Sequence, residues 1–532
     1  MRVRTDWTTF GTTLVVLLGM CVPLILMQEQ ANEFINAAFS IMTSQFGVLY
    51  LWGGIGAVGL LIWLAMSRFG SVKLGDANEK QEFTNFSWAG MLFCAGIGSG
   101  ILYWGVIEWA YYLQSPPLGI EAGTDQAAEW AATYGMFHWG ITAWAFYGVP
   151  AIPLAYLYHV RKQPELKLSA ACEGVIGKHA KGPLGKLIDI LFMFGLLGGV
   201  GTSLGLGTPM VAAGLSEIFG IENTFGLSVF VMLLCTAIFA ISAYSGLKKG
   251  IKVLSDINVW LAIALLVFIL VVGPTLFILK TTTNGLGLMF QNFVQMNFWT
   301  DPITNSGFPE SWTIFYWAWW IAYGPFMGLF VAKISRGRTI RQVIMGMLVF
   351  GSLGCWAYFG VLGNYAMYLE LNDLLSVTNL LNDEGAPTAI IAVISSLPLP
   401  TLVLPLFCIL ALIFLATQFD SAAYIMAAVA TVELKEDQHP ARWHRMFWAF
   451  ALAALPLSLM FAGGLKALQT AAITLALPQL FITVIMAISL IRWLHQDERD
   501  GVHAYGSPIN TDSENNLDDV SKIDKSSPVP SH

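Results

Sequence analysis

The feature that most constrains this chain is a succession of apolar segments, each long enough to cross a lipid bilayer. A spanning helix needs about 20 mostly apolar residues, and such segments follow one another from Phe10 to Leu494. Charged residues make up only 11% of the 532 residues, whereas a soluble domain has about 25%. The sequence therefore predicts an all-α polytopic membrane protein with about twelve transmembrane helices, near residues 8–28, 45–66, 86–114, 128–158, 188–213, 224–244, 257–279, 311–333, 341–369, 402–432, 446–464 and 468–493.

The basic residues predict how these helices are oriented. Lys and Arg concentrate in the cytoplasmic loops of membrane proteins. With both termini in the cytoplasm, all but two of the 27 Lys and Arg lie in or beside cytoplasmic segments, the exceptions being Lys280 and Lys466. The first apolar segment has spanning length and lacks a cleavage pattern, so it is interpreted as a helix rather than a signal peptide. We expect a multi-pass protein of a bacterial inner membrane.

Three segments outside the spans have features of their own. Residues 286–299 are apolar with scattered polar residues, which is typical of an amphipathic helix at the membrane interface. Residues 370–400 form an outer insertion with a short helix near 388–396. The polar stretch 496–532 is predicted to be a disordered cytoplasmic tail. Residues 1–495 would then form a single transporter domain.

Two spans contain residues that weaken a helix at mid-membrane depth. Gly96, Gly98 and Gly100 fall within five residues of the third span, and Tyr323-Gly324-Pro325-Phe326 lies in the eighth. Transporters bind substrate where helices break in equivalent halves. Spans 3 and 8 each begin a block of five helices, so the sequence predicts a five-plus-five inverted repeat over residues 86–279 and 311–493. The alternative is that these glycines only allow neighbouring helices to pack closely.

Two aromatic clusters lie in the middle of spans, away from the interfaces where Trp usually gathers. The fourth span contains Trp139, Trp144 and Tyr147, and the eighth contains Trp317, Trp319, Trp320 and Tyr323. Cages of such electron-rich rings bind quaternary ammonium groups, each ring contributing about 0.5–2 kcal/mol. No acidic residue lies within either cluster. The clusters indicate a site for a methylated cation, with ordinary packing as the alternative.

Several motifs resemble those of the betaine/carnitine/choline transporter family. They are Gly96-Ile97-Gly98-Ser99-Gly100, Phe137-His138-Trp139-Gly140, Gly201-Thr202-Ser203-Leu204-Gly205, and Phe315-Tyr316-Trp317-Ala318-Trp319-Trp320 continuing to Lys333-Ile334-Ser335-Arg336-Gly337-Arg338-Thr339. The similarity covers roughly residues 10–495. The resemblance implies the fold of sodium-coupled amino-acid transporters with two extra N-terminal helices, and usually a homotrimer.

The resemblance also implies a set of substrate-binding residues. Matched by motif, the cage residues would be Trp139, Trp144 and Tyr147 together with Trp319, Trp320 and Tyr323. Tyr111 is similar to a substrate-contacting position of carnitine exchangers. Choline carriers tend to have an acidic residue where this chain has Gly100, so the resemblance favours a zwitterion. Its own carboxylate would meet the helix-end amides freed at Gly96, Gly98 and Gly100.

The identity of the zwitterion stays open at this point. Tyr323 is similar to the carnitine exchangers, whereas Pro325-Phe326 is similar to the betaine symporters. Glycine betaine, carnitine, γ-butyrobetaine and ectoine are alternatives. The sulfonium zwitterion dimethylsulfoniopropionate is a further alternative because it also lacks N–H donors.

The resemblance implies a sodium site between spans 3 and 10. By motif its ligands would be the carbonyls of Cys94, Ile97 and Phe414, the Thr417 hydroxyl and, where symporters commonly have Ser, the Gln418 amide. Sodium-independent exchangers place an Arg at the position matched by Asn258, and Met327 matches a methionine of those exchangers. We expect Na⁺ symport, with ion-independent exchange as the alternative.

Other classes of function find little support. No Walker A motif occurs in the chain, which disfavours an ATP-driven pump. No HExxH motif, paired carboxylates or Ser/His arrangement occurs in the spans, which disfavours an enzyme. The six scattered cysteines show no metal or disulfide spacing, so no cofactor is expected besides the coupling ion. The acidic tail does not favour nucleic-acid binding. A membrane osmosensor remains the alternative of another class.

Overall fold

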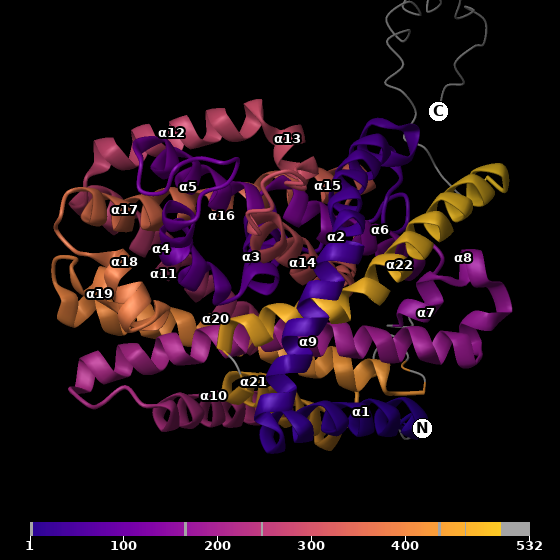
Figure 1. The fold of residues 1–532 in the computed structure, drawn as a ribbon. Coiled ribbons are helices and arrows are strands. Elements are labelled where there is room, and N and C mark those ends of the chain that lie inside the picture. The colour runs from indigo at the N-terminus through magenta and orange to yellow at the C-terminus, as the bar shows by residue number, and fades with distance from the viewer. Residues whose placement is uncertain are drawn as a thin grey trace, which may run out of the picture.

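The computed structural model is built of helices that pack against one another and cross at various angles (Figure 1). It describes residues 4–163, 167–245, 248–432, 434, 438–462 and 464–501. Within these ranges the extended pairings are the isolated bridges Thr5–Thr431 and Lys73–Thr339. Nine helices there are long and apolar enough to cross a membrane, or up to eleven if each of two bent pairs is one span. The predicted all-α polytopic class is confirmed.

The predicted spans correspond to the following segments. The uninterrupted ones are α1 (Trp7–Leu26), α2 (Gln28–Met66), α9 (Pro183–Phe219), α10 (Phe225–Ser245), α11 (Lys248–Val272), α14 (Ile314–Ile334), α20 (Pro400–Val429), α21 (Arg442–Ala462) and α22 (Gly464–Arg499). The interrupted ones are α3 (Asn85–Ile97) with α4 (Gly100–Gln114), α5 (Asp125–His138) with α6 (Ile141–His159), and α15 (Ile340–Gly346), η4 (Met347–Gly351), α16 (Ser352–Tyr358), η5 (Phe359–Gly363) and α17 (Asn364–Leu371).

The third span breaks where the glycines predict it. Helix α3 ends at Ile97, α4 begins at Gly100, and the two axes differ by 62°. Gly98 has φ +58° and ψ −154°, a combination open in practice only to glycine. The break therefore depends on this residue.

The expected break in the eighth span is wrong. Helix α14 runs without interruption from Ile314 to Ile334, through Pro325. A Cβ on Gly324 would lie 2.9 Å from the Phe146 carbonyl oxygen, and one on Gly328 would lie 3.0 Å from the backbone of Ala151. These glycines let α14 pack closely against α6, which is the alternative interpretation of such residues.

The fourth span has a break that the sequence analysis did not predict. Helix α5 ends at His138 and α6 begins at Ile141, with Trp139 and Gly140 between them in non-helical conformations. A Cβ on Gly140 would lie 2.7 Å from the Met136 carbonyl oxygen and 2.8 Å from the Trp356 indole nitrogen. Close packing on both sides requires glycine here, and the break places Trp139 at a helix end.

The loops place further helices at opposite ends of the molecule. The predicted outer insertion contains α18 (Val377–Asp383) and α19 (Ala386–Ser395), and these lie at the left of Figure 1. The connection predicted to be cytoplasmic contains α7 (Leu168–Ala171), α8 (Glu173–Ile176) and η2 (Gly177–Lys181); α7 and α8 lie at the right. This separation is what two sides of a membrane require.

The expected interfacial helix begins earlier than predicted. Helix α11 ends at Val272, and the chain turns by 112° into α12 (Thr275–Gln291), followed by α13 (Phe293–Phe298). Pro274 lacks the N–H that would extend the hydrogen bonding of α11, and its backbone is non-helical, with φ −75° and ψ 69°. Residues 275–279, which were assigned to the seventh span, therefore belong to the transverse helix α12.

The C-terminal helix extends into the range expected to be tail. Helix α22 continues to Arg499, so Gln496 to Arg499 are helical. The rest of the predicted tail, from residue 502 onward, lies outside the described residues.

Candidate functional site

Aromatic rings from α14 and from the α5–α6 break pack together in the core. Trp139 contacts Trp320 edge to face at 4.8 Å between ring centroids and Trp319 at 5.9 Å. Trp319 and Trp320 stack at 5.0 Å with their planes 9° apart. Tyr147 meets both Trp320 and Tyr323 at 5.8 Å. We call these five residues, Trp139, Tyr147, Trp319, Trp320 and Tyr323, the aromatic cluster.

Hydrogen bonds fix each ring of this cluster at its polar edge. Trp319 Nε1 donates to the Gly199 carbonyl and Trp320 Nε1 to the His138 carbonyl, each at 2.9 Å. The Tyr147 hydroxyl donates to the Gly96 carbonyl at 3.0 Å, and the Tyr323 hydroxyl to the Ala95 carbonyl at 2.8 Å. The tyrosines therefore bind the last turn of α3, directly before the break.

The glycines of the break lie against these rings. A Cβ on Gly100 would lie 3.2 Å from the Trp139 ring and 3.4 Å from the Trp319 ring. A Cβ on Gly96 would lie 3.1 Å from Trp144, which contacts Tyr147 edge to face at 5.5 Å. The structure thus brings the broken backbone together with the predicted aromatic residues of both spans except Trp317, which packs against Phe137 and Phe146.

Tyr111 lies apart from the aromatic cluster. It is partly buried on α4, where it packs against Trp312 at 5.2 Å and Trp104 at 6.0 Å. The structure describes no ring contact between Tyr111 and the cluster residues; Tyr316, which contacts Trp104 and Trp139, links the two groups.

The sequence analysis missed an acidic residue beside the cluster. Glu108, on α4, is fully buried and accepts a hydrogen bond from Trp139 Nε1 at 3.0 Å. Glu108 lies outside both aromatic stretches in sequence. The stretches themselves contain no acidic residue, but the fold brings this one against Trp139. A carboxylate within a membrane span usually has a function. This rule could have identified Glu108 as a candidate functional residue from the sequence.

The residues of the expected sodium site lie beside the same break. A Cβ on Gly98 would lie only 2.1 Å from Gln418 Oε1, so the Gln418 amide covers the break. Its Nε2 donates to Ser203 at 3.1 Å, while its Oε1 is buried and accepts no hydrogen bond of normal geometry among the described residues. The Thr417 hydroxyl donates to the carbonyls of Ile413 and Phe414. Cys94 and Ile97 are buried in the last turn of α3.

These groups fit a small hard cation. The Gln418 amide, the Thr417 hydroxyl and the backbone carbonyls all supply oxygen, the donor that such cations prefer. Gln418 Oε1 is a buried acceptor in need of a partner. Asn258, which carries no charge, is fully buried and lies against Cys94.

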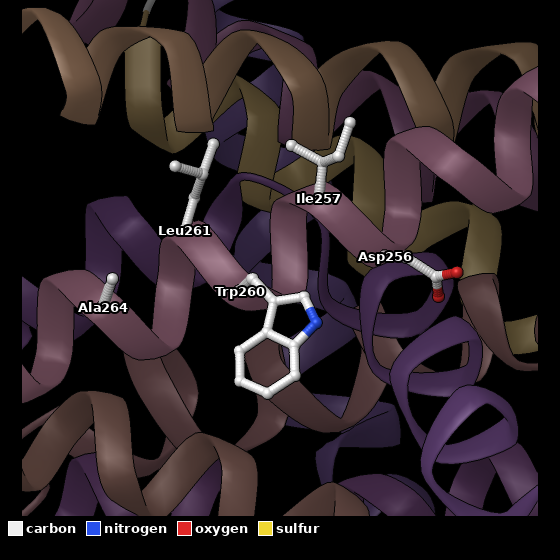
Figure 2. Close-up of a pocket in the computed structure, with 5 residues that line it drawn as sticks. All are labelled: Asp256, Ile257, Trp260, Leu261 and Ala264. Carbon is white, nitrogen blue, oxygen red and sulfur yellow. The ribbon is translucent and has the colours of Figure 1, made fainter.

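A groove on the molecular surface is separate from this site. It runs along α11, where Asp256, Ile257, Trp260, Leu261 and Ala264 line it (Figure 2). Ile257 and Trp260 are largely exposed, whereas their neighbour Asn258 is buried on the opposite side of the helix. An apolar surface of this kind is expected where a helix faces lipid.

A family profile that matches nearly the whole chain identifies one family. The profile described as BCCT, betaine/carnitine/choline family transporter, matches residues 8–499. An uncharacterized transporter of Escherichia coli K12, YeaV, is 41% identical over 84% of this chain and 92% of its own length. A carnitine transporter of Acinetobacter baumannii is 35% identical over 93% of this chain and 90% of its own. A solved Na⁺-coupled sialic acid symporter is 12% identical over 86% of this chain and 85% of its own, with a TM-score of 0.39.

Proposed function

Because this chain belongs to the betaine/carnitine/choline transporter family, a family of multi-pass membrane transporters rather than enzymes, we propose that it carries a small quaternary-ammonium zwitterion across a bacterial inner membrane together with Na⁺. The observation that carries the proposal is the convergence of Trp139, Trp319 and Trp320 with Tyr147 and Tyr323 beside the α3–α4 break. In the structure these rings contact one another, so a substrate must separate them as it binds.

The two ends of a zwitterion have partners of different kinds in this arrangement. A trimethylammonium head has no N–H to donate, and ring faces stabilise it without hydrogen bonds. Helix α4 begins at Gly100, beside Trp139 and Trp319. The N-terminus of a helix favours anions, so the substrate carboxylate would lie at the start of α4 with its onium head among the rings.

The α3–α4 break and the residues of α20 that lie against it, Thr417 and Gln418, supply the proposed coupling-ion site. Na⁺ bound there would add a positive charge that holds α20 to the end of α3. Gln418 Oε1 would turn its unpaired lone pairs to the ion, and Thr417 would add its hydroxyl oxygen. Asn258 offers no resident cation to substitute for Na⁺, which supports symport over exchange.

One observation favours the exchanger alternative. A Cβ on Gly96 would lie 3.1 Å from the Met327 methyl group, so the methionine shared with the exchangers packs against the break. The relative named a carnitine transporter adds carnitine to the substrates to be compared. Na⁺-independent exchange of carnitine and γ-butyrobetaine is therefore the second candidate, and dimethylsulfoniopropionate a further substrate.

Uptake into proteoliposomes tests the proposal. Labelled glycine betaine, carnitine, γ-butyrobetaine and dimethylsulfoniopropionate are compared with an inward Na⁺ gradient and with K⁺ in its place. We expect accumulation of at least one onium zwitterion with Na⁺ only. Equal uptake in K⁺, stimulated by unlabelled substrate inside, would establish exchange instead.

The family resemblance extends the proposal to a homotrimer with both termini in the cytoplasm. Light scattering of the purified protein, corrected for detergent, should give about three times the chain mass of 58.2 kDa. Accessibility of cysteines introduced before residue 6 and after residue 501 would test the orientation.

A further inference from the structure

Glu108 accepts hydrogen bonds from three aromatic side chains. Its Oε2 receives the Trp139 indole N–H at 3.0 Å and the Tyr316 hydroxyl, and its Oε1 receives the Tyr112 hydroxyl at 2.6 Å. The side chain has no exposed surface. Two of these partners lie outside α4, one at the α5–α6 break and one on α14, so the carboxylate joins the two elements that supply the aromatic cluster.

The only ion-pair partner that the structure describes for Glu108 is a histidine. His138 Nδ1 lies 3.6 Å from Glu108 Oε1 and 2.9 Å from the Tyr112 hydroxyl. The other ring nitrogen of His138 lies 3.0 Å from the Thr313 hydroxyl. Trp139 Nε1 can only donate, and the carboxylate form of Glu108 also accepts from Tyr316 and Tyr112. The single Tyr112 proton then goes to Glu108, and His138 Nδ1 donates to the Tyr112 oxygen. A buried carboxylate is costly unless something compensates its charge.

The position of this charge affects the rings that face the substrate. Charge-assisted donation from the indole N–H to a carboxylate shifts electron density into the indole, which makes its faces more negative. Tyr316 donates to the same oxygen, and its ring lies nearly parallel to those of Trp319 and Trp320, with 22° between the planes in each pair. The carboxylate therefore lies at the N–H edge of Trp139 and at the hydroxyl of Tyr316, whose ring lies beside rings that the proposed function assigns to the onium head.

We propose that Glu108 is the counter-charge of the aromatic cluster, a positioning residue that holds Trp139 and Tyr316 and makes the site select a positively charged methylated head over an uncharged one of the same shape. The inference rests on the proposed function and adds a charge to its binding site. A cluster of rings alone would discriminate less strongly, because a tert-butyl group packs against rings as well as a trimethylammonium group does.

A pair of isosteric ligands tests this role. Glycine betaine and 3,3-dimethylbutanoate differ only in having N⁺ or carbon at the centre of the trimethyl head. Their dissociation constants are measured by calorimetry on the purified full-length protein in saturating Na⁺. The wild type should prefer glycine betaine. In Glu108→Gln, a side chain of the same size without charge, this preference should shrink about tenfold.

Glu370→Gln is the matched control. It is the same substitution at the end of α17, where Glu370 accepts from the Thr378 backbone N–H at 3.0 Å, so the preference should stay within about twofold of wild type. If Glu108→Gln elutes differently from the wild type in size-exclusion chromatography, and so is misfolded, Glu108→Asp takes its place in the test because it keeps the charge. Its preference for glycine betaine should persist.

Two results would overturn the inference while leaving the proposed function in place. One is a Glu108→Gln protein in which both ligands weaken by the same factor, or in which neither weakens. The other is a Glu108→Asp protein that binds both ligands equally well. A wild-type protein that binds neither ligand nor any other onium zwitterion would instead refute the proposed function, and this inference with it.

Discussion

Trp320 has more ring contacts within the aromatic cluster than the tyrosines do, and its loss should weaken binding most clearly. It stacks on Trp319, meets Trp139 and Tyr147, and donates to the His138 carbonyl. Trp320→Leu removes a ring worth about 0.5–2 kcal/mol to a cation, together with its packing. We expect the KM for uptake to rise about tenfold or more, measured in proteoliposomes at equal protein density.

Trp448 provides the control for this substitution. It is fully buried, packs against Phe10 and Phe447, and lies outside the cluster. Trp448→Leu should lower thermal stability, as any large cavity does, but leave KM unchanged. A Trp320→Leu protein with normal KM would count against the cluster as the binding site.

Gly98 should tolerate no side chain. Alanine there would take an unfavourable φ of +58° and place its Cβ 2.1 Å from Gln418 Oε1. The strain and the displaced amide together cost about 2–5 kcal/mol. We expect Gly98→Ala to lose most Na⁺-driven uptake and to melt at a lower temperature.

Gly119→Ala is the control that separates the effect of backbone strain from an effect on the α3–α4 break. The φ of Gly119 is +71°, and nothing lies within 4 Å of a Cβ there. Gly119→Ala should cost about 1–2 kcal/mol through strain alone and keep Na⁺-driven uptake. Equal loss of uptake in both variants would show that the break has no special role.

At the scale of elements, α20 packs over the α3–α4 break, and its Thr417 hydroxyl allows a test of the proposed sodium site. Thr417→Ala removes one proposed ligand while leaving Gln418 in place over Gly98. We expect the Na⁺ concentration for half-maximal uptake to rise about tenfold, with substrate affinity at saturating Na⁺ near normal, because one oxygen donor is worth roughly 1–2 kcal/mol.

Ser421, one turn further along α20, is the matched control. Its hydroxyl donates to the Thr417 carbonyl at 2.9 Å rather than facing the break. Ser421→Ala should leave the Na⁺ dependence unchanged. If Thr417→Ala also leaves the Na⁺ dependence of uptake unchanged, Thr417 is not a ligand of the coupling ion.

The elements differ in how well sequence alone predicts them. Hydropathy locates the long helices because lipid demands long apolar runs, and three clustered glycines locate the break at Gly98. Pro325 was misleading because glycines beside a proline can serve close packing instead of a break, as Gly324 does against Phe146. Glu108 could not be placed from sequence because its partners come from three separate elements, and only their packing brings those partners together.

At the scale of the whole molecule, the C-terminal helix is fastened to the end of α6. Asp497 accepts hydrogen bonds from the Tyr156 hydroxyl at 2.6 Å and from both Nε and Nη2 of Arg161, at 3.0 and 2.6 Å. The Arg161 guanidinium also lies over the Trp493 ring at 5.1 Å. The helical part of the predicted tail, Gln496 to Arg499, is therefore held to the end of α6.

Two truncations should separate the contribution of the end of α22 from that of the residues after 501. Ending the chain after Gly501 keeps Asp497, and we expect uptake, its response to osmolality and the melting temperature to match the full chain. Ending it after His495 removes Asp497, the acceptor of these three hydrogen bonds from Tyr156 and Arg161. Lost charge-assisted hydrogen bonds of this kind cost about 1.5–3 kcal/mol each, less where Arg161 is partly exposed, so the melting temperature should fall by several degrees. Asp497→Asn in the full chain should reproduce most of that fall. An equal loss in both truncations would mean that the segment after residue 501, and not the contact with α6, stabilises this end of the molecule.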